Sequence, residues 1–321
     1  MIHFIKCCRS VDNYTKITRI NEGSYGVVYL AQDNETREKV ALKRIKPDQR
    51  QEGFPLTSLR EIKILMKCKH ENLLNVKEIV IGDKLTKVYM VMEYVDHDLS
   101  VLMKNKTKNW LESEVKCLML QLLRGIKYLH DNWIVHRDIK TSNLLLNNKG
   151  ILKLADFGMA REYGDPIKQY TPLVVTLWYR APELLLGAKT YGPEIDMWSV
   201  GCVFAELLNK EPLFPGNGEL DQLDKIFRLL GTANEKIWPG FNDLPMVKKV
   251  NFKPYLYNNL KQPFQYLSTN GFDLLNGLLT YDPKKRFTAE EALEHPYFKE
   301  KPLPKQPRDM PFFAPTNKGD F

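Results

Sequence analysis

The N-terminal part of the chain alternates apolar and polar positions over short runs. Alternation with a period of two is typical of strands that bury one face. Three runs show it, at residues 14–20, 26–32 and 38–45. Residues 88–95 form a denser apolar run that fits a buried strand, whereas residues 58–66 change to helical spacing, with Leu59, Ile62 and Met66 on one face. This pattern predicts a small β-rich unit that contains one helix.

The pattern becomes helical from residue 112 onward. Apolar side chains recur at three- and four-residue intervals and so predict one face of a long helix: Val115, Leu118, Met119, Leu122, Leu123, Ile126 and Leu129. Ser113 is the expected N-cap of this helix. Further helices are predicted at residues 195–208 and 218–230, an ordered loop at 238–264, and a Pro-rich, extended tail after Lys299.

These changes predict an α+β protein in which a small β-rich lobe precedes a larger, mainly helical lobe. We expect an N-terminal extension, the two lobes and the Pro-rich tail at residues 1–13, 14–95, 96–298 and 299–321, respectively.

Composition narrows the class of partner. The chain has 321 residues and a formal net charge of +8, but its positive charge is dispersed. The densest basic runs, at residues 104–108 and 284–286, lack the interleaved aromatic side chains of a nucleic-acid platform, so we expect no direct nucleic acid partner. No apolar stretch approaches the roughly 20 residues that span a membrane, so we expect no membrane partner. The five cysteines are odd in number and include no C-x-x-C pair, which favours reduced thiols and a location in the nucleus or cytoplasm, or both.

A glycine-containing loop lies between the first two predicted strands, at residues 21–28. Gly23 and Gly26 let backbone N–H groups approach a phosphate closely, although the same pair is also typical of an ordinary hairpin turn. Lys43 follows in an apolar strand, and Glu61 on the next helix could hold its ammonium against nucleotide phosphates. At this point two unrelated surface residues remain a viable interpretation of that pair.

Residues 136–143 read His-Arg-Asp-Ile-Lys-Thr-Ser-Asn and match the pattern H-R-D-L-x-x-x-N, with Ile in place of Leu. Asp138 can accept the proton of an incoming hydroxyl, and Asn143 can supply a neutral oxygen to Mg²⁺. Lys140 can offset charge on a transferring phosphoryl group.

Two further motifs follow in order. Asp-Phe-Gly at residues 156–158 comes after a strand-like run, where the Asp156 carboxylate can bridge Mg²⁺ to the phosphates of ATP while Phe157 packs into the core. Ala-Pro-Glu closes the segment at residues 181–183. Each tripeptide is common, but five elements in this order, each on the required kind of secondary structure, predict ATP-dependent phosphoryl transfer.

With these motifs, the sequence resembles the protein kinases from about residue 14 to about residue 298. The resemblance implies the bilobal kinase fold, with ATP bound in the cleft. Residues 54–61 are similar to the cyclin-binding helix of the cyclin-dependent kinases and differ by one change from the PITSLRE form, and residues 176–183 resemble the segment before the substrate site of these kinases. Residues 8–11, 131–133 and 297–304 are similar to the subgroup of cyclin-dependent kinases ten and eleven, without separating the two.

By this resemblance, Lys43, Asp138 and Lys140 are the catalytic residues, and Asn143 and Asp156 hold the metal. The residues implied at the nucleotide are Asn21, Gly23, Gly26, Val28, Ala41, Lys43, Glu61, Glu93, Val95 and Asp98. Glu93 to Val95 would form the hinge that holds adenine, next to Met92, and Asp98 would lie near the ribose. Asn21 replaces the first glycine of G-x-G-x-x-G, and asparagine tolerates left-handed backbone angles better than most residues do.

The resemblance also implies regulation by phosphorylation. Thr171 would be the activating phosphosite, phosphorylated by a separate kinase, and Arg60, Arg137 and Arg161 would gather its phosphate. Ser24 and Tyr25 resemble inhibitory phosphosites. Val174 and Val175 match residues that shape a pocket for proline, which implies Ser-Pro or Thr-Pro protein substrates. Glu183 would pair with Arg286, and Asp196 would brace the catalytic loop.

The implied partner is a cyclin of the L or M type, bound through the helix region Pro55 to Glu61. Two alternatives stay open. A cyclin-independent kinase of the mitogen-activated type is disfavoured because the chain has Tyr170-Thr171-Pro172 in place of Thr-x-Tyr. A pseudokinase scaffold is disfavoured because all five residues that carry the chemistry are present: Lys43, Glu61, Asp138, Asn143 and Asp156.

Overall fold

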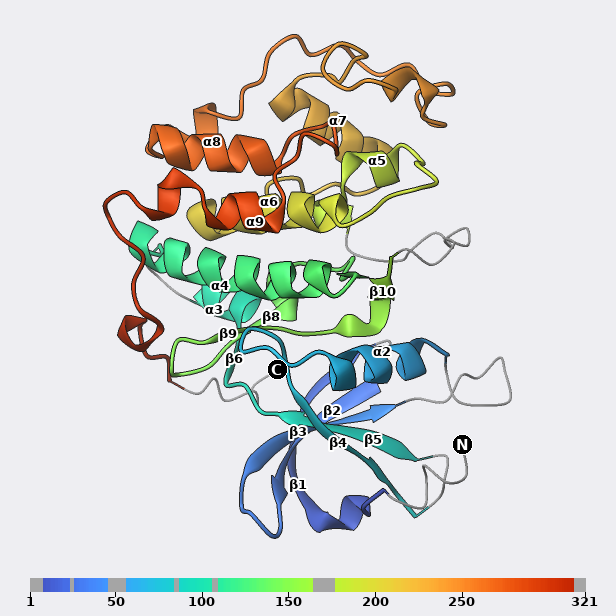
Figure 1. The fold of residues 1–321 in the computed structure, drawn as a ribbon, viewed down its shortest axis with the longest axis vertical. Helices are drawn as coiled ribbons and strands as arrows, with labels where there is room; N and C mark the ends of the chain where they lie inside the picture. Colours follow the sequence, from blue (N-terminus) through green and yellow to red (C-terminus); the bar gives the residue numbers. More distant parts are fainter. Residues whose placement is uncertain are drawn as a thin grey trace.

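The computed structural model describes residues 8–23, 26–45, 56–83, 87–105, 109–163 and 177–314, with backbone only at 21–23 and 56–57. Several predictions lie outside the described residues: those on Ser24, Tyr25, Pro55, Thr171, Val174 and Val175. The predicted α+β organisation is confirmed, because a five-stranded sheet and a helical lobe stack along the long axis of the molecule (Figure 1). Among the described residues, no helix is long and apolar enough to cross a membrane.

The N-terminal lobe is an antiparallel sheet with strand order β1-β2-β3-β5-β4. Its strands are β1 (Tyr14–Gly23), β2 (Gly26–Asp33), β3 (Lys39–Ile45), β4 (Val76–Ile81) and β5 (Val88–Glu93). The alternating runs predicted β1, β2 and β3, and the dense apolar run predicted β5, because one or both faces of these strands are buried, whereas β4 was not predicted. A small core of Tyr14, Ala31, Val40, Leu42, Val80, Tyr89 and Val91 covers one side.

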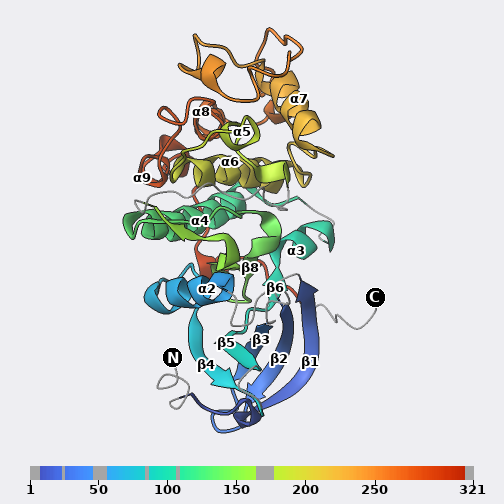
Figure 2. The same ribbon diagram turned by 90° about the vertical axis from the view of Figure 1, so that its right-hand side faces the viewer.

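The helix α2 (Leu56–Lys67) lies between this sheet and the helical lobe (Figure 2). Its orientation differs from the simplest interpretation of its apolar spacing. Leu59 and Met66 are 39% and 45% exposed, whereas Glu61, Ile64 and Leu65 are buried. The buried face is therefore nearly opposite to the face that carries Leu59 and Met66, since residues 61 and 64–65 lie about half a turn away from them on a helix of 3.6 residues per turn.

The C-terminal lobe is built from helices of very different length. They are α3 (Leu99–Asn105), α4 (Glu112–Asp131), α5 (Pro182–Leu185), α6 (Glu194–Asn209), α7 (Glu219–Leu230), α8 (Thr269–Leu278) and α9 (Ala289–Leu293). The predicted stripe on α4 is buried as expected. Its predicted N-cap is wrong: the helix begins at Glu112, and the Leu111 N–H donates to the Glu114 carboxylate at 2.9 Å. Glu114 therefore satisfies this helix end from inside the first turn.

Five short strands pair into two small sheets within the loops of the C-terminal lobe. They form the pair β10 (Arg161–Glu162) with β7 (Ile134–Val135), and a small sheet of β6 (His97–Asp98), β8 (Leu144–Leu146) and β9 (Leu152–Leu154). Short 3-10 helices occur at Val11–Asn13, Thr141–Asn143, Phe157–Met159, Leu177–Tyr179, Phe241–Asp243, Gln262–Phe264, Pro296–Phe298 and Pro307–Asp309. The segment 238–264, predicted as ordered loop, contains only two of these short helices.

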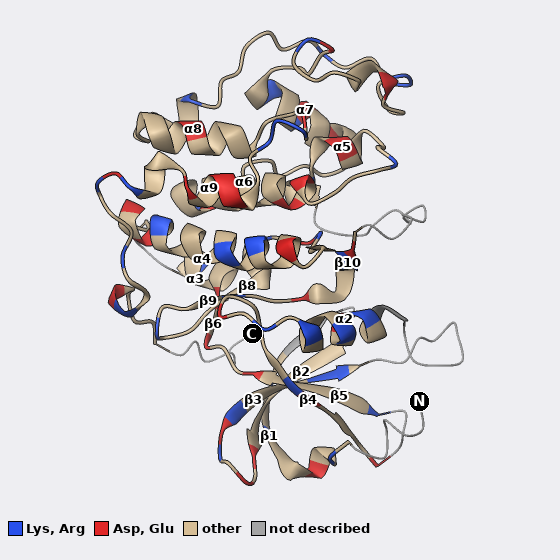
Figure 3. Ribbon diagram, in the orientation of Figure 1, with Lys and Arg blue, Asp and Glu red and all other residues tan. Residues whose placement is uncertain are grey.

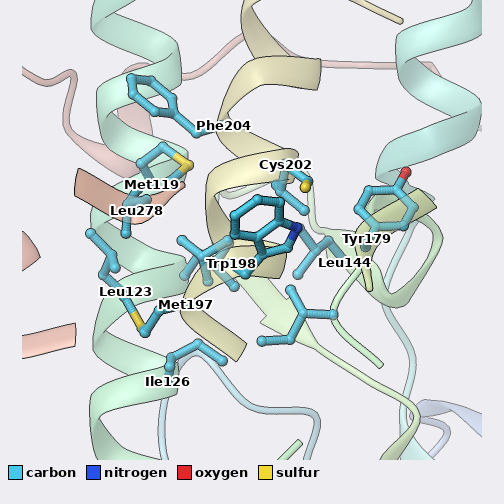
Figure 4. Packing of buried hydrophobic residues seen from close by; sticks show 14 of the residues in the cluster. Met119, Leu123, Ile126, Leu144, Tyr179, Met197, Trp198, Cys202, Phe204 and Leu278 are labelled. Carbon is cyan, nitrogen blue, oxygen red and sulfur yellow. The ribbon is translucent and has the colours of Figure 1, made fainter. Parts of the chain in front are cut away.

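The main core is centred on α6, which is buried on all sides from Ile195 to Leu208. Trp198 is completely buried there, and Figure 4 shows it between the side chains of α4 and Tyr179. Its ring stacks near Phe214 and lies beneath the Arg286 guanidinium. A helix buried on all sides is typical of the centre of a large domain, and α6 is the element to which the catalytic loop is anchored.

The tail after Lys299, predicted to be extended, has no α-helix or strand over residues 299–314 and includes one short 3-10 helix at Pro307–Asp309. Its packing along α4 was not predicted.

Candidate active site

A buried ion pair joins the sheet of the N-terminal lobe to the helix α2. Lys43 on β3 places its Nζ 2.6 Å from Oε1 of Glu61 on α2 and 3.9 Å from Oδ1 of Asp156. Burial raises the pKa of Glu61, and the neighbouring Lys43 ammonium opposes that shift. The expected Lys43–Glu61 pair is therefore present, and the alternative of two unrelated surface residues is wrong. The ammonium lies between two carboxylates, where it can bind phosphate oxygens.

The loop after β7 brings three predicted residues into contact. Lys140 Nζ lies 2.9 Å from Asp138 Oδ2, and Asn143 Nδ2 donates to the same oxygen at 2.9 Å and to the Asp138 carbonyl at 2.7 Å. Asp138 accepts both bonds, so the Asn143 amide nitrogen must face it and Oδ1 remains as an acceptor. The loop therefore holds the Asp138 carboxylate in one position.

Asp196 on α6 holds this loop by hydrogen bonds to its backbone. Its carboxylate accepts the backbone N–H groups of His136 and Arg137, both at 2.8 Å, and the His130 Nε2 group at 3.1 Å. Burial alone would raise the pKa of Asp196, but the hydrogen bonds and the nearby histidines hold it below its ordinary value. The charged carboxylate thus stabilises the left-handed backbone of Arg137, which has φ 70°.

Asp156 also lies in the left-handed region, with φ 61° and ψ 75°. The next residue, Phe157, is buried and meets the His136 ring edge-on at 4.9 Å. Burial lowers the pKa of His136, so this ring is neutral at pH 7. The completely buried Phe157 anchors the turn, as predicted, and sets the direction of the Asp156 carboxylate.

Two oxygens at this site suit a divalent cation. Asp156 Oδ1 is buried and has no hydrogen-bond partner among the described residues, and Asn143 Oδ1 is the acceptor that remains on its amide. Hard cations such as Mg²⁺ prefer such carboxylate and amide oxygens, and they usually take their other ligands from phosphates and water. No group of three or more His, Cys, Asp or Glu side chains within the described ranges could hold a metal alone. The pair fits Mg²⁺ as a companion of a nucleotide.

The nucleotide residues implied by the resemblance lie along one side of the same region. Val28, Ala41 and Val95 all join the apolar cluster that contains Met92. Gly26 has φ 151°, and a Cβ there would lie 2.1 Å from the Arg44 carbonyl oxygen, so only glycine fits this end of the hairpin. The side chains at residues 21–23 lie outside the described part of the chain, which leaves the consequence of Asn21 as a prediction.

The remaining two nucleotide residues have structural partners. Glu93 Oε1 accepts the Asn75 N–H at 2.7 Å and pairs with Lys153 at 2.9 Å, and the Glu93 N–H donates to the Asn75 carbonyl at 3.0 Å, so the side chain and the N–H of Glu93 are both engaged within the protein. Asp98 Oδ1 accepts the Ser100 N–H at 2.8 Å and hydroxyl at 2.6 Å, which makes Asp98 the cap of α3. The cap fixes the position of a carboxylate beside the expected ribose site.

Two of the three arginines predicted to bind the Thr171 phosphate lie close together. Arg137 Nε donates to the Met159 carbonyl at 2.6 Å, and Arg161 Nη1 donates to the next carbonyl, that of Ala160, at 2.8 Å. Arg60 lies on the exposed side of α2. The expected Glu183–Arg286 pair is also present, with bidentate contacts of 2.7 and 3.0 Å between buried side chains.

One buried network was missed at the level of sequence. The Glu206 carboxylate on α6 accepts the Tyr179 hydroxyl at 2.5 Å and the Thr141 hydroxyl at 3.0 Å. Burial raises the pKa of both Glu206 and Tyr179. The network joins the catalytic loop to the segment 177–180, and its only signal in the sequence is a glutamate within an apolar helical run.

Comparison with known proteins places this geometry in a family. The model of the protein kinase domain matches residues 14–298. Cyclin-dependent kinase G-2 of Oryza sativa subsp. indica is 59% identical over 99% of this chain and 46% of its own length. Human cyclin-dependent kinase 11A is 59% identical over 95% of this chain and 39% of its own length. Cyclin-dependent kinase 11 of Dictyostelium discoideum is 55% identical over 97% of this chain and 87% of its own length.

The chain thus spans less than half the length of the rice and human relatives. The matched region includes the Lys43–Glu61 pair, the 136–143 loop and Asp156. The chain belongs to the protein kinase family and, within it, to the cyclin-dependent kinases.

Proposed function

We propose that this protein is a cyclin-dependent serine/threonine kinase that transfers the γ-phosphate of ATP to Ser or Thr followed by Pro. The observation that carries the proposal is the single site formed by Lys43, Glu61, Asp138, Asn143 and Asp156. Their residue types and mutual contacts support the proposal, because phosphoryl transfer uses a lysine, a proton acceptor and two metal ligands of this kind. A pseudokinase would not need a catalytic carboxylate held by both a lysine and an amide.

The proposed reaction begins with the substrate hydroxyl beside Asp138. The carboxylate accepts the hydroxyl proton as the oxygen forms a bond to the γ-phosphorus, and the bond from that phosphorus to the bridging oxygen of ADP breaks. Lys140, already 2.9 Å from Asp138, offsets charge on the phosphoryl group in flight, and Lys43 binds the phosphates that remain on ADP.

Asn143 and Asp156 would hold Mg²⁺ through Asn143 Oδ1 and the Asp156 carboxylate. The bound cation would supply charge neutralisation between the β- and γ-phosphates. The two residues are fixed by their own surroundings: Asn143 by its bonds to Asp138, and Asp156 by the buried Phe157.

The protein substrate would approach the Asp138 carboxylate next to a small pocket, which is too narrow to hold a peptide itself. Arg137, Tyr179, Arg180 and Tyr191 line this pocket together with Asp138. The preference for proline rests on the resemblance at Val174 and Val175, and a nuclear or cytoplasmic location rests on the resemblance and the cysteine content.

The cyclin partner is supported by the exposed face of α2. Leu59 and Met66 are apolar and open to solvent, and basic residues run along the same helix (Figure 3). Glu162 of β10 pairs with Lys63 at 3.3 Å, and beyond it Trp133 is 63% exposed beside Tyr163. Exposed large apolar side chains next to charged ones are typical of a protein interface. An L- or M-type cyclin is the proposed occupant.

The activating phosphate is proposed on Thr171, added by a separate kinase. Arg137 and Arg161 lie together next to the start of the segment that contains this residue, and charge-assisted hydrogen bonds to a phosphate would order it. Phosphorylation of Ser24 and Tyr25 is proposed to inhibit nucleotide binding on the same resemblance.

The test measures transfer from labelled Mg·ATP to a Ser-Pro peptide, first with the chain alone and then with an L-type or M-type cyclin. Low transfer alone and a large increase with cyclin would support the proposal. Full activity without cyclin would favour the mitogen-activated type of kinase. Absence of transfer under every condition, including after phosphorylation of Thr171, would favour the pseudokinase. An Ala in place of Pro in the peptide tests the proline preference.

A further inference from the structure

The C-terminal tail, residues 299–314, is held along the helical lobe by backbone contacts. The buried Lys116 donates to the carbonyl oxygens of Glu300 and Pro302 at 3.1 and 3.0 Å. The Lys305 N–H donates to the Ser113 carbonyl at 2.9 Å. Figure 1 shows the tail leaving α9, passing the start of α4 and descending toward β6 and β9. The tail thus connects the base of the helical lobe to the junction between the lobes.

The turn between β8 and β9 is shaped to accept this tail. Gly150 has φ 74°, and a Cβ at this position would lie 1.9 Å from the Pro307 carbonyl oxygen and 2.9 Å from the Met310 Cβ. Met310 itself is buried. Only glycine allows the tail backbone to approach this closely, so tail and turn form one packed unit.

The tail then places Phe313 against the segment that follows the hinge. Its ring meets those of His97 and Trp110 edge-on, with centroids 5.7 and 5.8 Å apart. Its N–H donates to Asn148 Oδ1 at 3.3 Å. The preceding residue differs sharply, because Phe312 is 71% exposed. Of two adjacent phenylalanines, only Phe313 packs against the protein.

Asn148 connects Phe313 to the turn at Asp96 and His97, which lies between the expected hinge and Asp98 at the expected ribose site. The Asn148 Oδ1 that binds Phe313 also accepts His97 Nε2 at 3.0 Å, and the Asn148 N–H donates to Asp96 at 3.1 Å. His97 is buried, and its Nδ1 has no hydrogen-bond partner among the described residues, so Asn148 and the Phe313 ring orient this imidazole. The next residue is Asp98, whose carboxylate caps α3.

We propose that Phe313 is a positioning residue for ATP, which acts through Asn148 and His97 to hold the turn between the hinge and Asp98. The proposal rests on the proposed kinase function. The contacts that carry the proposal join Phe313 to His97, Trp110 and Asn148, none of which is assigned a part in phosphoryl transfer. Its contribution therefore concerns the adenosine end of the nucleotide and leaves the chemical step unchanged.

The experiment compares Phe313→Ala with the matched control Phe312→Ala in the full chain with its cyclin. We expect Phe313→Ala to raise the KM for ATP roughly three- to ten-fold, because edge-to-face aromatic contacts are worth that order of affinity. The kcat and the KM for the peptide should stay at parental values. Phe312→Ala should change none of the three, and Phe313→Tyr, which keeps the ring, should restore the KM for ATP.

A second variant tests the route through Asn148. Asn148→Ala should raise the KM for ATP by a similar factor, and the Phe313→Ala/Asn148→Ala double variant should be little worse than either single one, since both remove the same link. Independent, multiplying effects would contradict that route. If Phe313→Ala does not fold, the KM for ATP of Asn148→Ala decides.

An unchanged KM for ATP in an active Phe313→Ala protein would overturn the inference. Equal losses in kcat and in both KM values, with a lower melting temperature, would also overturn it, since that pattern marks general destabilisation. If the parental protein shows no turnover, the same comparison uses the Kd of a fluorescent ATP analogue. If the parental protein turns over but Phe313→Ala leaves the KM for ATP unchanged, only this inference is refuted and the proposed kinase function stands. A parent that binds no nucleotide refutes the proposed function and the inference together.

Discussion

Lys43 and Glu61 form an ion pair of 2.6 Å between β3 and α2, and both side chains are largely withdrawn from solvent. The pair fixes the rotation of α2 about its own axis, because Glu61 must face the sheet to reach the ammonium. Leu59 and Met66 consequently face solvent on the other side. One contact therefore orders the lysine that we propose to bind phosphate and leaves exposed the apolar surface that we propose for the cyclin.

Glu61→Gln tests this pair. The amide keeps the shape of the side chain but loses the charge that holds the Lys43 ammonium. We expect kcat/KM to fall roughly 10- to 100-fold, as for other losses of positioning at a reacting group. Steady-state kinetics with saturating peptide would measure the change. The exposed Glu71 offers the control Glu71→Gln, and equal activity of the two variants would show that the pair is not needed.

Asp138→Asn and Asp156→Asn should both abolish turnover but for different reasons. Loss of the proton acceptor should lower kcat on the order of 10²- to 10⁴-fold while Mg·ATP still binds. Loss of the metal carboxylate should instead remove the Mg²⁺-dependent part of nucleotide binding. Thermal shift with ATP, with and without Mg²⁺, would separate them. Identical magnesium dependence in the two variants would contradict the separate roles.

Arg286→Met should destabilise the helical lobe. The substitution leaves the buried Glu183 carboxylate without its bidentate partner, and breaking a buried pair in this way typically costs about 3–5 kcal/mol. Urea unfolding of the purified chain would measure it. Arg228→Met removes one side of the exposed Arg228–Asp224 pair and should leave the midpoint unchanged. A comparable loss in both variants would refute the structural role of the buried pair.

Stability should decrease as the pH falls below about 6.5, the ordinary pKa of histidine. Burial lowers the pKa of His136 in the folded protein, so the unfolded chain binds the proton first. The contribution of neutral His136 to the free energy of unfolding is therefore fully present above pH 6.5. It is lost as the pH falls from 6.5 toward the lower pKa of His136 in the folded protein. Urea midpoints between pH 7.5 and 5.5 should show this slope, and His136→Gln should reduce it. If His136→Gln leaves the pH dependence of the urea midpoint unchanged, titration of His136 is not the cause of that dependence.

Leu59→Ser together with Met66→Ser should weaken cyclin binding without loss of stability, since both side chains are already exposed. We expect the Kd for cyclin to rise roughly ten-fold or more, as when buried interface side chains are truncated. Binding titration and thermal melting would measure the two quantities. Leu256→Ser is the control, because Leu256 is 83% exposed at a distant loop. Unchanged affinity in the double variant would move the docking surface away from this face.

Local patterns were sufficient to predict four of the five strands of the N-terminal sheet, the helices α2, α4, α6 and α7, and the order of the motifs, whereas β4 and α8 were not predicted. Strand alternation and helical stripes reflect burial of one face, and the stripe coincides with the buried face on α4 but not on α2. The motif at 136–143 was equally readable, because its three polar side chains bind one another across five residues or fewer. The matched family confirms the fold that these features predicted.

Contacts between distant segments escaped prediction. Glu206 finds its partners Thr141 and Tyr179 only when α6 lies beneath the catalytic loop. The tail was expected to be extended because proline-rich composition favours that state in isolation. Its partners on α4 lie far earlier in the sequence: Lys305 pairs with Glu114, which is 191 residues away.

The sequence by itself indicated which groups are proposed to carry the chemistry and where most of the strands and helices lie, since both follow from residue type and short spacing. The tertiary structure decided which face of α2 is buried, which side chains Glu206 joins, and where residues 299–314 pack. Each of these depends on an ion pair, hydrogen bond or ring contact between residues far apart in the chain. Such contacts form only when the lobes have packed, so no local pattern encodes them.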